Sequence, residues 1–305
     1  MTAWSTSVGR SDQGDVPTVA LCVAGYKGLL FLRDFSERFP ICSVFSYSQA
    51  NVLDASNTEI TQLCRARRIP LREMRRPLAS DLEAFDLVLT VGWQFLLKDC
   101  GENIVIMHDS LLPRYRGFSP TVAAMINGER QLGVTALLPA ALPDTGPILA
   151  QSAVEISYPL KIKDALERLA PCYTAAAIEV VARLRSSGLM GIAQDEAQAS
   201  RSLWYDECDQ FLDWSQDAAR LSRQVDAMGW PYTGARCRYR GEVVIVHEAD
   251  PLPDLAFENR RVGKIWAVTK GTPEVVCGHG LLRLRRCTGA DSVSVVFDQV
   301  RARLE

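Results

Sequence analysis

"TVALCVAG" (Thr18–Gly25) is the stretch that decides how the first half of this 305-residue chain folds. It is a short apolar run that stops at a glycine, which is typical of a strand buried on both faces of a sheet. Apolar residues then recur with helical spacing over Leu29–Phe39, and a second apolar run, Ile41–Tyr47, predicts another strand. Strand, helix and strand in succession predict a parallel pair joined by a helix.

The same alternation continues as far as residue 108. A helix is expected over Asn57–Ile69, with Asn57 or Thr58 as its N-cap, and strands are expected over Phe85–Trp93 and Asn103–His108. We therefore expect an α/β fold with a Rossmann-like, mostly parallel sheet and helices on both faces. No GxGxxG motif follows the first strand, so the sequence does not predict a dinucleotide site.

A change of composition near residues 194–204 indicates a second domain. A helix is expected before it over Lys161–Gly188, where Pro171 should kink or split it, and another after it over Ser215–Gly229. The short apolar runs beyond, of which Ser292–Phe297 is the last, predict a small antiparallel, OB-like barrel. We divide the chain into a flexible leader (1–17), a first domain that carries the candidate site (18–200) and a C-terminal barrel domain (201–305).

Charge and cysteine content narrow the class of protein. The net charge is −2 and no block of like charges occurs, so nothing indicates a polyanionic partner. The nine cysteines include no CxxC pair, which fits neither a disulfide framework nor a zinc site, and no metal is expected. The first residues lack the layout of a signal peptide, and no apolar run is long enough to span a bilayer. We expect a protein of the reducing cytoplasm.

A conspicuous histidine stands at the end of the last expected strand of this series. His108 is one of three histidines in the chain and the only one before residue 247. Ligands of parallel sheets bind at the carboxyl ends of strands, and His108, Trp93 and Gln94 all lie at such ends. An imidazole titrates near neutral pH, so His108 is a candidate for moving protons.

Six short motifs, in order along the chain, resemble one enzyme family. They are "HDSLLPRYRG" (His108–Gly117), "NGE" (Asn127–Glu129), "GVT" (Gly133–Thr135), "DTG" (Asp144–Gly146), "LDW" (Leu212–Trp214) and "PYTGA" (Pro231–Ala235). Together they resemble the 10-formyltetrahydrofolate-dependent formyltransferases, the group of methionyl-tRNA formyltransferase and the sugar N-formyltransferases. The likeness is strongest over Asp86–Ile156.

The resemblance implies a reaction in which an amine attacks the formyl carbon of 10-formyltetrahydrofolate, a co-substrate, and no metal takes part. His108 and Asp144 match the catalytic histidine and aspartate of the family. The segment with Trp93, Gln94 and Leu96 matches the part that lines the pterin pocket, to which Asp144 also belongs. Ser110, Arg114 and Arg116 are expected to contact the substrate. The two arginines either bind a phosphate or carboxylate through the planar guanidinium or are solvated loop charges.

One family position is altered. The family pattern is Asn-x-His, and Ile106 stands where the asparagine would hold the formyl oxygen. Losing one such donor costs roughly 100- to 1000-fold in rate. Three interpretations stay open: another donor replaces it, with Asp109, Ser110 and Asn103 nearby in sequence; the enzyme is slow or does a related transfer; or the chain binds folate or substrate without catalysis.

The acceptor of the formyl group is expected to be a small amine. A tRNA acceptor predicts a basic second domain, because phosphates dominate nucleic-acid affinity. Residues 206–305 hold 14 Lys and Arg against 15 Asp and Glu, which argues against tRNA. A nucleotide-linked amino sugar and an amino-acid-like metabolite both remain. Five aromatic residues either stack on such a ligand or seal a domain junction, with the junction favoured: Trp204, Tyr205, Trp214, Trp230 and Tyr232. The resemblance leaves a monomer and a homodimer both open.

Overall fold

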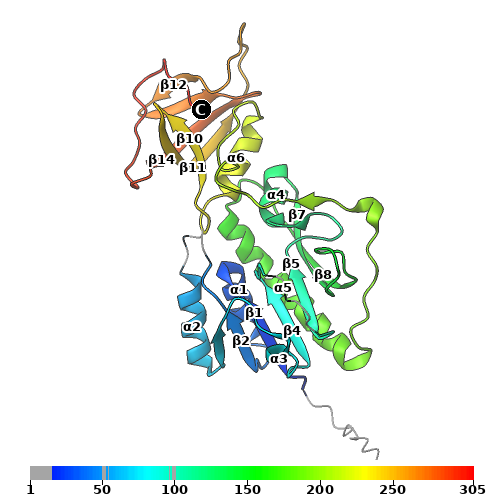
Figure 1. Cartoon of the computed structure of the whole chain (residues 1–305). Coiled ribbons are helices and arrows are strands. Elements are labelled where there is room, and N and C mark those ends of the chain that lie inside the picture. The colour runs from blue at the N-terminus through cyan, green and yellow to red at the C-terminus, as the bar shows by residue number, and fades with distance from the viewer. Residues whose placement is uncertain (1–15, 50–52, 54, 96, 98–100) are drawn as a thin grey trace, which may run out of the picture.

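The computed structural model describes residues 16–49, 53, 55–95, 97 and 101–305. A seven-stranded sheet has the order β3-β2-β1-β4-β5-β7-β8, in which β1 to β5 run parallel and β7 and β8 are antiparallel (Figure 1). This confirms the expected α/β fold with a mostly parallel sheet. The strands of this sheet are β1 (Val19–Val23), β2 (Ser43–Ser46), β3 (Leu71–Glu73), β4 (Leu87–Val91), β5 (Ile104–His108), β7 (Gln131–Leu137) and β8 (Ile148–Glu155).

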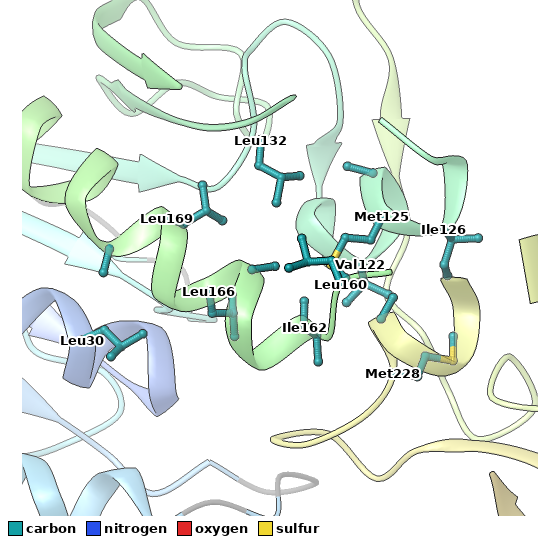
Figure 2. Close-up of a cluster of buried hydrophobic side chains, with 14 of the residues drawn as sticks. Leu30, Val122, Met125, Ile126, Leu132, Leu160, Ile162, Leu166, Leu169 and Met228 are labelled. Atoms are coloured by element: carbon teal, nitrogen blue, oxygen red, sulfur yellow. The ribbon is translucent and has the colours of Figure 1, made fainter. Parts of the chain in front are cut away.

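Five helices accompany this sheet, and apolar side chains join them to it. They are α1 (Gly25–Phe35), α2 (Ser56–Arg67), α3 (Ala79–Leu82), α4 (Pro120–Asn127) and α5 (Ile162–Ser186). Figure 2 shows side chains of α1, α4 and α5 as part of one buried cluster that extends to Met228, which follows α6 (Ala218–Ala227). A single buried cluster therefore runs from the sheet into the C-terminal part.

Two expected helix features are corrected by the structure. Of the two outcomes expected at Pro171, a split is ruled out, since α5 is one element on both sides of it, and the kink stays a prediction. The apolar face of α5 packs on α1, β7 and β8, and this packing holds the helix together where one backbone hydrogen bond is lost. The helix expected at Asn57 begins at Ser56, and its N-cap is Ala55, which has no side-chain capping bond.

The C-terminal part is a five-stranded antiparallel sheet of order β10-β11-β14-β13-β12. Its strands are β10 (Ala235–Tyr239), β11 (Glu242–Leu252), β12 (Ile265–Thr269), β13 (Thr272–Val276) and β14 (Leu281–Gly289). Leu304 bridges to Tyr239 at one edge and Arg303 bridges to Lys264 beside the other, so the last residues close the sheet toward a barrel. The strand expected at Ser292–Phe297 is wrong, because only Ser294 makes a bridge there.

A small two-stranded sheet connects the two expected domains. β6 (Arg116–Gly117) pairs in parallel with β9 (Arg201–Ser202). The expected boundary between residues 200 and 201 therefore lies directly before β9, the strand that pairs with the segment Arg116–Gly117 of the first domain. The 3-10 helix η1 (Glu196–Gln198) lies just before it.

Candidate functional site

His108 is the last residue of β5, at the carboxyl edge of the sheet. Because side chains alternate along a strand, Ile104, Ile106 and His108 share one face. The imidazole is buried, and its Nε2 lies 2.9 Å from the carbonyl oxygen of Tyr115. A carbonyl only accepts hydrogen bonds, so Nε2 carries the hydrogen. In the neutral imidazole this leaves Nδ1 as the basic atom.

Asp144 faces that basic nitrogen. The distance from His108 Nδ1 to Asp144 Oδ2 is 3.6 Å, so the structure brings the predicted pair together. Asp144 has a φ of 54°, in the left-handed region that few residues other than Gly, Asn and Asp adopt readily. Its Oδ2 accepts a hydrogen bond of 2.8 Å from the Gly117 backbone N–H. The loop thus holds the carboxylate beside the imidazole, and the catalytic roles of both residues stay a prediction.

Arg116 is linked to the Asp144 loop through Gln194. Its guanidinium is almost fully buried, at 2% exposure, and donates two bonds each to Gln194 and Glu196, between 2.7 and 3.0 Å. Gln194 in turn donates to the carbonyl oxygens of Asp144 and Gly146, both at 2.8 Å. These bonds inside the chain favour a structural role over the expected contact with substrate. No pattern in the sequence links Arg116 to residues so distant.

The other two expected substrate contacts also have partners inside the chain. The Ser110 hydroxyl donates to the Arg114 carbonyl at 2.7 Å and stabilises the turn after β5. The Arg114 guanidinium pairs with Glu129 and lies over the Tyr115 ring. Its side chain is 55% exposed, so of the three it is the one that a ligand in solution can reach.

A buried ion pair next to His108 was not predicted. Lys27 Nζ, in the first turn of α1, lies 3.0 Å from both carboxylate oxygens of Asp109, and Thr121 also donates to that carboxylate. Burial alone would raise the pKa of Asp109, but the charge of Lys27 and the hydrogen bonds from Thr121 and Lys27 outweigh it and lower this pKa to about 2. Burial would likewise lower the pKa of Lys27, yet the Asp109 carboxylate raises it. Both groups are therefore charged at neutral pH.

None of the three residues that could replace the missing asparagine is a free hydrogen-bond donor beside His108. Asp109 is ionised and can only accept. Ser110 donates to Arg114. The Asn103 side chain lies before β5, at its opposite end from His108, where it donates to the carbonyls of Leu82 and Phe85. In this conformation none of the three offers a hydrogen to a ligand beside His108.

The segment expected to line the folate pocket follows β4. Val91 pairs with Met107, so the residues after β4 lie alongside His108 at the sheet edge. The Trp93 ring packs edge-on against Tyr47, and its Nε1 is buried without a hydrogen-bond partner among the described residues. Gln94 is exposed, and its backbone N–H donates to the Tyr47 hydroxyl. Leu96 lies outside the described residues.

A cavity of about 460 Å³ lies between α4 and the C-terminal part. Its lining includes Ser119 and Val122 on one side and the segments 204–210 and 228–236 on the other. Ser119 is two residues beyond Gly117, which holds Asp144. His108 and Asp144 themselves do not line this cavity.

Two negative findings concern only the part of the chain that the structure describes. No group of three His, Cys, Asp or Glu side chains is placed to hold a metal ion there. No helix within it combines the length and apolar character needed to cross a membrane.

Comparison with known proteins identifies both parts of the chain. Residues 60–181 match the formyl transferase family, and residues 206–295 match the formyl transferase C-terminal domain. A methionyl-tRNA formyltransferase of Anaeromyxobacter dehalogenans is 31% identical over 250 residues, which cover 78% of this chain and 77% of that protein. The methionyl-tRNA formyltransferase of Methylococcus capsulatus is 34% identical over 207 residues, 65% of either protein.

Solved structures show the same fold at low sequence identity. WlaRD, a sugar 3N-formyl transferase, superposes with a TM-score of 0.60 at 13% identity, covering 89% of this chain and 98% of that one. HypX from Aquifex aeolicus superposes with a TM-score of 0.61 at 16% identity, covering 92% of this chain and 46% of that one. Because both domain families match and a relative is 31% identical over most of its length, this chain belongs to the formyl transferase family.

Proposed function

We propose that this protein is an N-formyltransferase that moves a formyl group from 10-formyltetrahydrofolate to the amine of a small acceptor. The observation that carries the proposal is the meeting of His108 Nδ1 and Asp144 Oδ2, 3.6 Å apart at the carboxyl edge of the sheet. Family membership supports it, because the two residues occupy the motif positions that the resemblance predicts. The free thiols of all eight described cysteines support a location in the reducing cytoplasm.

The pair is arranged to move a proton between two nitrogens. An attacking amine must lose a proton, and the departing folate nitrogen must gain one. The Tyr115 carbonyl fixes the hydrogen on His108 Nε2, which leaves Nδ1 to accept the proton of the amine. The Asp144 carboxylate then stabilises the imidazolium until Nδ1 returns the proton to the leaving group.

The co-substrate would approach from the edge where β4 and β5 end. We propose that Trp93, Gln94 and Leu96 contact the pterin ring. The buried Nε1 of Trp93, which lacks a partner among the described residues, supports this, since a buried N–H without an acceptor is costly. A heteroatom of a bound ring would satisfy it.

Two classes of acceptor are supported by different observations. The slight negative charge of residues 206–305 favours a small amine. The names of the relatives favour methionyl-tRNA. Both belong in the test.

The test is the release of tetrahydrofolate when the protein meets 10-formyltetrahydrofolate and a panel of amino sugars, amino acids and methionyl-tRNA. We expect turnover with a small amine and a loss of roughly 100- to 10,000-fold in His108→Ala. Folate binding without turnover on any acceptor would contradict the proposal and identify a silent binding protein. Turnover with methionyl-tRNA and with no other acceptor would show that the acceptor is a tRNA and not a small amine.

A further inference from the structure

We propose that the cavity between α4 and the C-terminal part holds the body of the acceptor, and that its lining selects a ring-shaped body without phosphate. The proposal rests on the proposed function and names the substrate class of the same site. It excludes the nucleotide-linked amino sugars that the sequence left open. Its grounds are the position, the aromatic lining and the charge of the cavity.

The position places the cavity near the loop that binds Asp144. Gly117 donates its backbone N–H to Asp144, and Ser119, which lines the cavity, is two residues further on, a span of at most about 7 Å. Tyr232, from the segment that follows α6, also lines the cavity. The cavity therefore lies beside the loop whose backbone binds Asp144, although His108 and Asp144 are not part of its lining.

The aromatic lining fits a ring. Of the five aromatic residues that the sequence singled out, Trp204, Tyr205 and Tyr232 line the cavity. Trp204 is 61% exposed, so part of the cavity lining is a large apolar surface open to solvent. The other two have structural partners: Trp214 is buried in the core, and Trp230 packs edge-on against Tyr26. The lining of the cavity thus includes three aromatic residues, and an aromatic or sugar ring can stack on such side chains.

The charges of the lining oppose a phosphate. Asp206 and Glu207 contribute two carboxylates, and Arg236 is the one basic residue in the lining. The Arg236 Nη1 already pairs with Glu207, so it is not free to neutralise a pyrophosphate. Its Nε is buried and has no partner among the described residues, which suits a hydroxyl or carbonyl oxygen of a neutral ligand. A nucleotide would meet repulsion here.

The experiment compares glucosamine with glucosamine 6-phosphate, which differ only in the phosphate, and adds tryptamine and dTDP. Binding to the full chain is measured by calorimetry in the absence of folate. We expect glucosamine or tryptamine to bind at least tenfold more tightly than either phosphate compound. Trp204→Ala should weaken that binding about tenfold, whereas Trp266→Ala, a change to an exposed tryptophan of the barrel, should leave it unchanged.

Glu207→Gln sharpens the test, because it releases Arg236 from its carboxylate. This variant should bind glucosamine 6-phosphate more tightly than the wild type, and Glu258→Gln at the barrel surface should not. Equal or tighter binding of the phosphate compounds to the wild type, no binding of either amine, or no effect of Trp204→Ala would overturn the proposal. Folate turnover sensitive to His108→Ala tests the transferase function separately and can succeed when this proposal fails.

Discussion

Two aspartates flank the same histidine, and their surroundings differ. Asp109 follows His108 in the chain, and its carboxylate is buried against Lys27 and Thr121. Asp144 comes from a loop with a left-handed backbone, accepts one bond from Gly117, and leaves its Oδ2 3.6 Å from the imidazole. The first carboxylate is neutralised within the chain. The second is placed to respond when the imidazole gains a proton.

The different surroundings of the two carboxylates indicate a structural role for Asp109 and a role in the reaction for Asp144. A buried ion pair with both partners charged and hydrogen-bonded fixes the structure around it, and removing one partner is costly. A carboxylate that faces a histidine without a cation of its own can orient the ring and stabilise its charged form. We infer that Asp109 holds α1, β5 and α4 together, while Asp144 serves the reaction.

The largest effect is expected from Asp144→Asn. Asparagine adopts the left-handed backbone readily, and its carbonyl can still accept the bond from Gly117, so the fold should survive. Turnover should fall roughly 100- to 10,000-fold, because the charge that stabilises the imidazolium is lost. Steady-state kinetics and thermal unfolding on the same preparation check both statements. A drop in melting temperature as large as that of Asp109→Asn would contradict the division of roles.

Asp109→Asn should have the opposite profile. It leaves the Lys27 ammonium mostly buried without its counter-charge, and we expect a loss of about 3 kcal/mol in the free energy of unfolding. Urea titration measures this loss. The control is the double variant Lys27→Met/Asp109→Asn, which removes both charges and should recover part of the stability. Equal loss in the single and double variants would show that the ion pair is not the cause.

The sequence could predict one aspartate and not the other. Asp144 was found because a family motif carries it, and His108 because it ends a recognisable strand. Lys27 and Asp109 are 82 positions apart, and their pairing depends on how α1 sits over the sheet. Arg116 was found as a charge in a loop, but its partners Gln194 and Glu196 lie about 80 positions away, so its burial was not foreseeable.

Secondary structure, too, is predictable from the sequence where the signal is local and not where it depends on distant partners. Apolar periodicity predicted β1, β4 and β5, because a strand buried on both faces has a local signature. The same criterion failed at Ser292–Phe297, where Val293 and Val296 are exposed and no ladder forms. A valine-rich alternation describes the side chains of a strand, but a strand also needs a partner edge, which only the tertiary structure supplies.

Ile106→Asn tests whether the missing donor limits the rate. Ile106 shares the face of His108, so an asparagine amide there would lie on the side of the sheet where the imidazole lies. Since Asp109, Ser110 and Asn103 are not free donors, we expect turnover to rise, by up to about 100-fold. Steady-state kinetics with a saturating acceptor measures the change. An unchanged rate would mean that another group already serves the reacting oxygen.

The smallest effect concerns acid stability and again separates the two aspartates. The Asp109 pKa is lowered from 3.8 to about 2, so its stabilising contribution is fully present above its ordinary pKa and is lost as the pH falls through about 2. That contribution is roughly 2 kcal/mol. The difference in unfolding free energy between wild type and Asp109→Asn should therefore narrow as the pH falls from 5 to 2, because the protonated carboxyl and the amide are alike. Other carboxylates cancel in this difference, and a gap that stays constant over the range would show that Asp109 is not held ionised by Lys27.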